Sequence, residues 1–357
     1  MSVERTRLHS RIRDYDVVFQ ADGDFVNELV ALPNRLFIVD ENVWTAHRNG
    51  VLAPLPEQDV FVLRIGEELK NLGSVELVWD QLMGRAAKRN MTIVSIGGGI
   101  CQDITGFAAS TIYRGIGWVF LPTTLLAQSD SCIGSKTSLN YGRFKNLLGT
   151  FFPPNEVHIF APFLTTQNEL DYFSGLGEVV KLHVMGGRES ATRLAEAMSA
   201  IVVRDTAAVG RAVRDSLGVK RSYMEDDEFD TGRRNLLNYG HCFGHAIESA
   251  TDFAVPHGQA VVIGMILAQK IARARGTETD PAQMELLDRL FDQSLLAGHV
   301  PASLDVDAVI EAMKHDKKRT GEGLVLVMAN DGYEMVKVDD LSESEAREVL
   351  GSTFATT

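Results

Sequence analysis

The first half of the chain contains four short runs of almost continuous apolar residues. They span residues 36–39, 60–63, 92–96 and 118–121, and segments with a helical pattern, such as 72–89, separate them. An apolar run without alternation is typical of a strand that is covered on both faces. Strands that alternate with helices predict βαβ units around a parallel sheet. The expected fold class is therefore α/β, with a Rossmann-like parallel sheet in this half.

The pattern changes after Phe163. Residues 164–318 read as almost continuous helix with a few breaks, and the sequence FFPP at 151–154 interrupts the pattern before it. We therefore expect an α/β domain at 1–160 and a mostly α-helical domain at 161–357. Within the second, residues 324–328 and 333–338 predict a hairpin, and Ser342 with Glu345 predicts a capping box.

Composition limits the possible partners and location. The 357 residues carry a net charge of −13, so neither nucleic acid nor an anionic membrane is expected as a partner. No apolar run is long enough for a bilayer span, and the polar start MSVERTRLHSR has no signal-peptide core. Cys101, Cys132 and Cys242 are widely spaced and form no CxxC pair, so we expect buried thiols and a cytoplasmic location.

Polar residues follow three of the predicted strands. Gly97, Gly98 and Gly99 come after the third run and lead to Asp103, which we expect at the head of the next helix. Glycines at this point allow a pyrophosphate to approach the backbone and the helix N-terminus. Carboxylates and amides at the other strand ends are suited to ribose hydroxyls, so the pattern predicts a dinucleotide site. These residues are Asp40, Glu41, Asn42, Gly66, Glu67, Glu68 and Lys70.

A polar stripe characterises the segment 233–248. Arg234, Asn238, His241 and His245 are spaced by four, three and four residues, which places them on one face if the segment is a single helix. His257 follows a short distance downstream. Such a stripe among apolar residues predicts a metal site with an anionic ligand. The alternative from spacing alone is a set of core histidines paired with backbone groups or carboxylates.

Several motifs together resemble the dehydroquinate synthases and their relatives, the sugar-phosphate cyclases. They include GGGICQDITGFAAS at 97–110, PTTLLAQSDSCIGSKTSLN at 122–140, SGLGEVVK at 174–181 and NYGHCFGHAIE at 238–248. YRG at 113–115, KNLLG at 145–149, HGQAV at 257–261 and DKK at 316–318 extend the likeness over most of the chain. The order and spacing of the motifs are preserved.

The resemblance implies NAD and one divalent metal, Zn²⁺ or Co²⁺, as cofactors. By this likeness Glu178, His241 and His257 are the metal ligands, and His245 binds the substrate phosphate instead. Helical spacing alone would place both His241 and His245 on the metal. The residues implied to bind NAD are Asp40, Asn42, Glu67, Lys70, Gly98, Gly99, Asp103, Thr123 and Thr124.

The same likeness implies a substrate site of many polar residues. Lys136, Asn146, Asn238 and one of Lys317 and Lys318 are expected to join His245 at the phosphate, with Arg114 reaching in from a second copy of the chain. Lys220 and Arg234 match the positions that hold a substrate carboxylate. Asp130, Lys181 and Asp230 match positions near the ring hydroxyls. A homodimer is expected on the same ground.

The implied activity is the conversion of 3-deoxy-arabino-heptulosonate 7-phosphate to 3-dehydroquinate and phosphate, a lyase reaction with transient use of NAD. The chain departs from the family pattern at Cys101, Gln102, Ser135, Tyr239 and Asp230, and the shorter carboxylate at Asp230 leaves the exact substrate open. The alternatives are an aminodehydroquinate synthase or another carbocycle-forming cyclase, an NAD- and metal-dependent polyol dehydrogenase, and a non-catalytic descendant.

Overall fold

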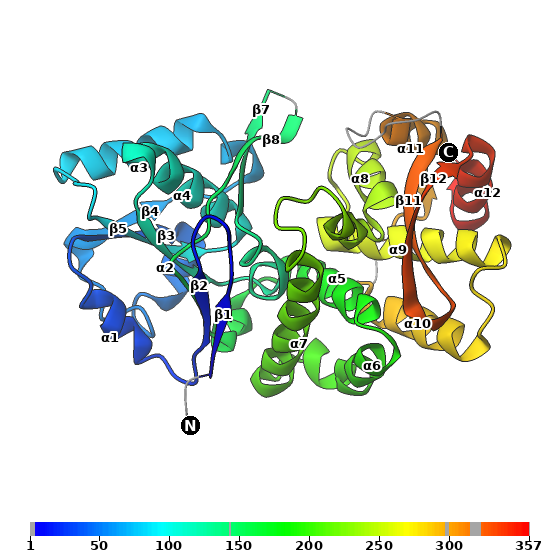
Figure 1. The fold of residues 1–357 in the computed structure, drawn as a ribbon, viewed down its shortest axis with the longest axis horizontal. Coiled ribbons are helices and arrows are strands. Elements are labelled where there is room, and N and C mark those ends of the chain that lie inside the picture. The colour runs from blue at the N-terminus through cyan, green and yellow to red at the C-terminus, as the bar shows by residue number, and fades with distance from the viewer. Residues whose placement is uncertain (1–3, 143, 297–299, 315–322, 357) are drawn as a thin grey trace. The chain divides into compact units, whose positions relative to one another are not determined.

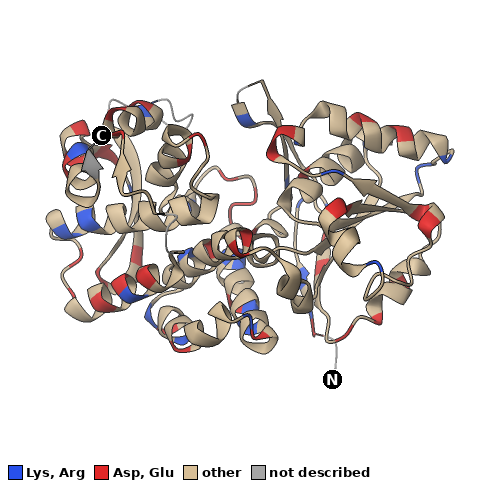
Figure 2. Ribbon diagram, turned by 180° about the vertical axis from the view of Figure 1, so that it is seen from behind, with Lys and Arg blue, Asp and Glu red and all other residues tan. Residues whose placement is uncertain are grey.

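The computed structural model describes residues 4–142, 144–296, 300–314 and 323–356. The chain forms two compact units, Met1–Gln167 and Asn168–Thr357, each of which is described by itself (Figure 1). Within the described residues, no helix has the length and apolar character needed to cross a lipid bilayer. Acidic and basic residues are interspersed along the ribbon of each unit (Figure 2).

A seven-stranded sheet organises the first unit. The four predicted strands are present as β3 (Arg35–Asp40), β4 (Val60–Leu63), β5 (Thr92–Gly97) and β6 (Gly117–Pro122). The sheet order is β1-β2-β9-β6-β5-β3-β4, and every pairing is parallel except that of β1 with β2. The predicted α/β class with a parallel sheet is therefore confirmed.

Three strands of this sheet were not predicted. They are β1 (Glu4–Leu8), β2 (Tyr15–Phe19) and β9 (Glu156–Ile159). The strand β1 is charged and lies at the edge, and Arg5 and Arg7 of β1 both form ion pairs with Asp16 of β2. Each of these strands has at most three consecutive apolar residues, so pattern alone does not separate them from loops.

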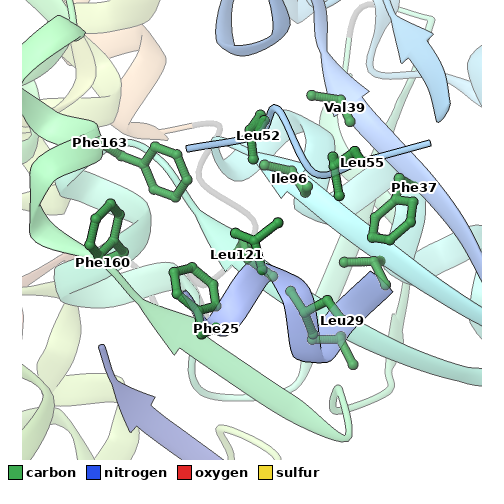
Figure 3. Close-up of a cluster of buried hydrophobic side chains, with 13 residues drawn as sticks. Phe25, Leu29, Phe37, Val39, Leu52, Leu55, Ile96, Leu121, Phe160 and Phe163 are labelled. Atoms are coloured by element: carbon green, nitrogen blue, oxygen red, sulfur yellow. The ribbon is translucent and has the colours of Figure 1, made fainter. Parts of the chain in front are cut away.

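Helices cover the sheet and close its core. They are α1 (Phe25–Val30), α2 (Glu41–His47), α3 (Leu72–Gly84) and α4 (Gly99–Thr111), with short 3₁₀ turns at Glu57–Asp59, Glu67–Leu69, Ile112–Arg114 and Ala161–Thr166. Figure 3 shows a buried cluster in which Phe25 and Leu29 of α1 meet Phe37, Leu121 and other strand residues. Apolar residues on successive strand positions are buried here because both faces of the sheet are covered.

A further hairpin extends from the first unit. A π-helical turn at Ala127–Ser131 precedes β7 (Lys136–Tyr141) and β8 (Phe144–Phe151), which pair antiparallel. Burial alternates along β7, as expected for a strand with one covered face. We did not predict these strands, because their polar residues match motif positions rather than an apolar run.

The second unit is mostly helical. Its helices are α5 (Glu169–Met185), α6 (Arg188–Val202), α7 (Thr206–Met224), a 3₁₀ helix η6 (Arg233–Asn238), α8 (His241–Ala250), α9 (His257–Ala274), α10 (Pro281–Ser294), α11 (Val306–Lys314) and α12 (Glu343–Thr353). The helix α9 contacts α5, α8, α10, α12 and β11. It is therefore buried on most sides, which explains its apolar sequence.

Two predicted features late in the chain are confirmed. The strands β11 (Leu324–Asn330) and β12 (Glu334–Leu341) form the expected hairpin around a short 3₁₀ turn, and Ser342 with Glu345 forms the capping box of α12. A short parallel pair, β10 (Ser303–Leu304) with β13 (Ala355–Thr356), was not predicted.

Glycines allow the helices of the second unit to approach closely. A Cβ on Gly177 of α5 would collide with the carbonyl of Gly258 on α9, and a Cβ on Gly258 would collide with the carbonyl of Ser174. Gly264 of α9 packs in the same way against the carbonyl of Gly240, which precedes α8. We call these contacts the glycine seam. It brings α5 and α8 to within backbone contact of α9.

Two of the three cysteines are buried, as predicted. Cys101 and Cys132 are buried, and Cys242 is only partly buried. Burial raises the pKa of the Cys101 thiol to about 12, so this thiol stays protonated and behaves as a small apolar side chain.

Candidate functional site

Three helices of the second unit place the predicted metal ligands together. Glu178 lies on α5, His241 is the first residue of α8, and His257 is the first residue of α9. Glu178 Oε1 lies 3.5 Å from Nε2 of His241 and 3.3 Å from Nε2 of His257. The glycine seam explains the convergence, since Gly177 precedes Glu178 and Gly258 follows His257.

The helix expected to carry the whole polar stripe is not continuous, so that prediction is wrong. Arg234 and Asn238 lie on η6, and α8 begins only at His241. Between them Gly240 adopts a left-handed conformation with φ +77, where a Cβ would also strike the carbonyl of Val261 on α9. The close approach of α9 therefore breaks the helix, because only glycine fits there without strain.

The distances suit a divalent cation. Two ligand atoms bound at about 2.1 Å in tetrahedral geometry lie roughly 3.4 Å apart, close to both carboxylate–imidazole distances. Glu178 is 1% exposed, and Lys181 Nζ lies 2.5 Å from its Oε2. A buried carboxylate beside two imidazoles is a donor set that zinc and cobalt accept, and three protein ligands leave a fourth coordination position for substrate.

Hydrogen-bond acceptors fix the orientation of both imidazoles. His257 Nδ1 lies 2.9 Å from Glu248 Oε2, and His241 Nδ1 lies 3.1 Å from the carbonyl of Tyr239. With a proton on each Nδ1 and a cation in place of any proton on Nε2, each Nε2 presents a lone pair to a metal ion beside Glu178. This is the arrangement in which an outer acceptor orients a metal-binding histidine.

The two imidazoles have opposite pKa shifts. Burial opposes charge on His257, but hydrogen bonds and charges from Glu178 and Glu248 outweigh it and raise the pKa of His257 to about 10. Burial, Lys181 and the neighbouring histidines hold the pKa of His241 well below its ordinary value. The carboxylates of Glu178 and Glu248 thus place negative charge around His257, where a cation would bind.

His245 lies beside the same group. The ligand atoms of His241, His245 and His257 all lie within 4.8 Å of one another, and the His245 ring is 5.1 Å from the His241 ring between centroids. His245 is the exposed member of the three. A set of three histidines is thus a second geometric candidate, and the assignment of His245 to phosphate stays a prediction.

The predicted carboxylate-binding pair lies on two neighbouring elements. Lys220 of α7 and Arg234 of η6 are 7% and 4% exposed, and α7 contacts η6. Asp230 precedes η6 with a left-handed φ of +61, and Asn238 Nδ2 donates to the carbonyl of Asn235 at 2.7 Å. Lys317 and Lys318 lie outside the described residues.

Asn146 forms hydrogen bonds within the first unit, and its phosphate role stays a prediction. Lys70 Nζ lies 2.6 Å from Asn146 Oδ1 and 2.6 Å from Asp103 Oδ2. Ser138 Oγ lies 2.9 Å from the same Asn146 oxygen, and its backbone amide donates to Asp103. A residue expected at the phosphate is here joined to Lys70 and Asp103, two residues expected at NAD.

The remaining predicted NAD residues lie at the ends of the parallel strands. Asp40 ends β3 and accepts from the amide of Asn42 at 2.8 Å, so it caps α2. Glu67 accepts from Asn140 Nδ2 at 2.8 Å. Asp103 is not at the head of its helix as predicted, because α4 already begins at Gly99 with Gly98 as its N-cap.

The glycine turn packs closely against the residues that follow β6. A Cβ on Gly98 would come within 2.9 Å of the Thr124 side chain. Thr123 follows β6, and its Oγ1 is buried without a hydrogen-bond partner among the described residues. An unsatisfied hydroxyl next to the glycine turn at the start of α4 fits a polar cofactor group such as a pyrophosphate.

The last three predicted residues belong to the first unit. Asp130 lies in the π-helical turn, Lys136 is the exposed first residue of β7, and Arg114 is exposed with φ +61 at the end of a 3₁₀ turn. Their substrate roles stay predictions.

Two residues that hydrogen-bond to candidate site residues were not singled out from the sequence. Glu248 lies on α8 seven residues after His241, a spacing that places both on one helix face and offered a signal. Asp227 lies in a polar loop, DDEFD, and its contacts are visible only in the folded chain.

Comparison with known proteins covers both units. A family model described as 3-dehydroquinate synthase N-terminal matches residues 60–174, and one described as 3-dehydroquinate synthase C-terminal matches residues 175–319. The chain is 39% identical over 284 residues to a 3-dehydroquinate synthase of Geobacter metallireducens, covering 78% of each chain. It is 34% identical over 357 residues to one of a Picosynechococcus species, covering 97% of this chain and 98% of the relative.

A solved structure shares the fold. It is a 2-epi-5-epi-valiolone synthase of Streptomyces hygroscopicus with NAD⁺ and Zn²⁺ bound, 26% identical with a TM-score of 0.81, covering 95% of this chain and 96% of that one. The family models span more than half of the chain and the curated relatives most of it, which confirms the predicted resemblance. This chain is therefore an enzyme of the 3-dehydroquinate synthase family.

Proposed function

We propose that this enzyme converts 3-deoxy-arabino-heptulosonate 7-phosphate to 3-dehydroquinate and phosphate, with NAD and one divalent metal ion. The observation that carries the proposal is the convergence of Glu178 with Nε2 of His241 and of His257 at 3.5 and 3.3 Å. Family membership supplies the reaction class, and the donor set supports zinc or cobalt.

The bound cofactors supply two kinds of chemistry: NAD accepts and returns a hydride, and the metal acts as a Lewis acid. The protein's own residues bind and orient the substrate. Glu178, His241 and His257 would hold the metal. Lys181 Nζ, 2.5 Å from Glu178 Oε2, would hold a proton beside the substrate hydroxyls.

The cationic residues suit a substrate with two anionic groups. Lys220 and Arg234 are nearly buried, so their attraction for a carboxylate is weakened less by water than at the surface. His245, Asn238 and a lysine from the pair at 317–318 are proposed for the phosphate. The substrate roles of Arg114, Asp130, Lys136, Asn146 and Asp230 are proposed on the family likeness.

One assay tests the proposal. The protein is incubated with NAD, Zn²⁺ and 3-deoxy-arabino-heptulosonate 7-phosphate, and phosphate release and NADH absorbance are followed together. Phosphate release without NADH accumulation supports the cyclase. Accumulating NADH would indicate a polyol dehydrogenase, and phosphate release only from the corresponding amino sugar would indicate an aminodehydroquinate synthase.

A cytoplasmic homodimer is also proposed. Sedimentation in solution tests the dimer. If Arg114 acts in the partner's site, mixing inactive Arg114→Ala chains with inactive His257→Ala chains will restore about a quarter of the activity per chain, from the dimers with one intact site. No recovery in mixed dimers would remove Arg114 from the shared site.

A further inference from the structure

The loop between α7 and η6 is organised by one carboxylate. Asp227 Oδ1 accepts from the amide of Thr231 at 2.8 Å and from its hydroxyl at 3.1 Å. Asp227 Oδ2 accepts from the amides of Gly232 at 2.7 Å and of Arg234 at 2.9 Å. One buried side chain therefore satisfies four donors of the segment that leads into η6.

The same segment carries two proposed substrate-binding residues. The hydrogen bonds of Asp227 span Asp230, which has a left-handed φ of +61, an uncommon conformation outside glycine. They end on the amide of Arg234, whose guanidinium donates to the carbonyl of Glu228. Asn235 Nδ2 also donates to the carbonyl of Asp230 at 3.1 Å.

Further contacts join this segment to the end of α7. Arg233 Nη1 donates to the carbonyl of Ser222 at 3.1 Å, and its guanidinium lies 4.7 Å from the centroid of the Tyr223 ring. Lys220 lies on the same helix, within one turn of Ser222 and Tyr223. The chain between Lys220 and Arg234 is thus tied together by hydrogen bonds of Asp227 and Arg233.

We infer that Asp227 is a positioning residue that sets Arg234, relative to Lys220, for binding the substrate carboxylate. This inference rests on the proposed function, because the carboxylate belongs to the proposed substrate. It assigns Asp227 no contact with substrate, metal or NAD.

The ionisation of Asp227 supports this role. Burial opposes its charge, but the hydrogen bonds from Thr231, Arg234 and Gly232 outweigh burial and lower the pKa of Asp227 to about 2. The side chain is therefore an acceptor-only carboxylate at neutral pH. An asparagine in its place would turn an NH₂ group toward amides that need an acceptor.

The test compares Asp227→Asn with Asp226→Asn, since Asp226 is the exposed neighbour. The probes are 3-dehydroquinate, which has a carboxylate and no phosphate, and inorganic phosphate, each titrated into zinc-loaded protein by calorimetry. We expect Asp227→Asn to weaken 3-dehydroquinate binding about 10-fold to 100-fold and to leave phosphate affinity and zinc content within twofold. Asp226→Asn is expected to match the unchanged enzyme in all three measurements.

Amide hydrogen exchange provides a readout that needs no substrate. Exchange in the peptide 228–238 is expected to be faster in Asp227→Asn and unchanged in Asp226→Asn. A milder variant, Thr231→Val, removes only the hydroxyl donor and is expected to shift 3-dehydroquinate affinity in the same direction by a smaller factor. It stands in if Asp227→Asn does not fold.

The outcomes separate this inference from the proposed function. If the protein without substitutions releases no phosphate from the proposed substrate, the proposed function is contradicted. The hydrogen-exchange comparison of Asp227→Asn with Asp226→Asn still tests the loop in that case. If the unmutated enzyme is active, and Asp227→Asn binds 3-dehydroquinate as tightly as Asp226→Asn does, the inference alone is contradicted. Equal weakening of both probes also contradicts it, because the effect would then not be specific to the carboxylate.

Discussion

The orientation of two imidazoles decides the chemistry of the candidate metal centre. His241 and His257 each have an acceptor at Nδ1, and each directs Nε2 toward the buried Glu178 carboxylate. These contacts favour Glu178, His241 and His257 over the three-histidine set. A ligand set that includes Glu178 also leaves His245, the exposed histidine, available for an anion.

The ligand assignment predicts different zinc contents for three alanine variants. His241→Ala and His257→Ala each remove one of three ligands, so we expect them to retain less than about a tenth of the bound zinc after dialysis. His245→Ala is expected to keep zinc and to bind inorganic phosphate about 10-fold more weakly. Zinc loss in His245→Ala, with zinc retained in a Glu178→Ala variant, would favour the three-histidine set.

Glu248 is predicted to tune metal affinity without touching the metal. In Glu248→Gln the acceptor at His257 Nδ1 becomes a neutral amide, which weakens the orientation of the ring. We expect the zinc dissociation constant, measured by competition with a chelator, to rise about 10-fold to 100-fold. Glu196→Gln on the exposed face of α6 is the control; equal affinities in the two variants would contradict this role.

Residue patterns in the sequence predicted only part of the candidate site. Spacing singled out His241, His245 and His257 but left open which of them bind metal, and family likeness was needed to add Glu178 from a helix some sixty residues earlier. Glu248 and Asp227 form hydrogen bonds to His257 and to the loop before η6. Such contacts depend on tertiary packing, which a single sequence does not display.

At the scale of elements, the glycine seam determines how close three helices lie. Gly177 and Gly258 let α5 and α9 meet backbone to backbone, and Gly240 with Gly264 does the same for α8 and α9. The first residue of α9 and the first residue of α8 are metal-ligand candidates, so the seam sets the ligand distances directly.

The variant Gly258→Ala is predicted to disrupt the centre. Its Cβ would overlap the carbonyl of Ser174, which forces α5 and α9 apart and costs about 1–3 kcal/mol or more. We expect a lower urea midpoint together with loss of zinc. The control Gly218→Ala lies on the exposed side of α7 with no atom near its Cβ, and is expected to stabilise the protein by about 0.5–1 kcal/mol. Normal zinc content in Gly258→Ala would show that the seam does not set the ligand distances.

The start of α12 predicts a pH dependence. Hydrogen bonds from Arg275 and Ser342 lower the pKa of Glu345 to about 2, below its ordinary value of 4.5. A carboxyl whose pKa is depressed by folding stabilises the folded state above about pH 4.5, and this contribution disappears as pH falls toward 2. We expect Glu345→Gln to lower the urea midpoint at pH 7 and to match the unchanged protein near pH 2. A difference that grows on acidification would contradict this account.

Elements that contain an apolar run could be predicted from the sequence. Elements whose boundaries depend on contacts with other parts of the fold could not. Strands β3, β4, β5 and β6 appear where the sequence indicated, as do the β11–β12 hairpin and the capping box of α12. The strands β1, β2, β7, β8 and β9 and the short β10–β13 pair were missed. The break at Gly240 was missed as well, because its cause is the approach of α9 rather than a local signal.

At the scale of the molecule, the metal candidates all belong to the second unit and the glycine turn to the first. A ligand that binds only the folded state stabilises it, by about 2.7 kcal/mol at a hundredfold excess over its dissociation constant. We therefore expect zinc to slow hydrogen exchange mainly in α5, α8 and α9, and NAD to slow it mainly around residues 97–124. Zinc protection confined to the first unit would contradict the assigned centre.

The glycine seam also matters for protein engineering. A mutagenesis library intended to change substrate choice would gain little from randomising positions 177, 240, 258 and 264. A larger side chain at any of them would collide with the backbone of a neighbouring helix and push the helices apart. Diversity is better directed at the loop 228–232, where side chains change while the backbone amides remain anchored. Selection for new activities from this scaffold is therefore expected to leave the four glycines untouched.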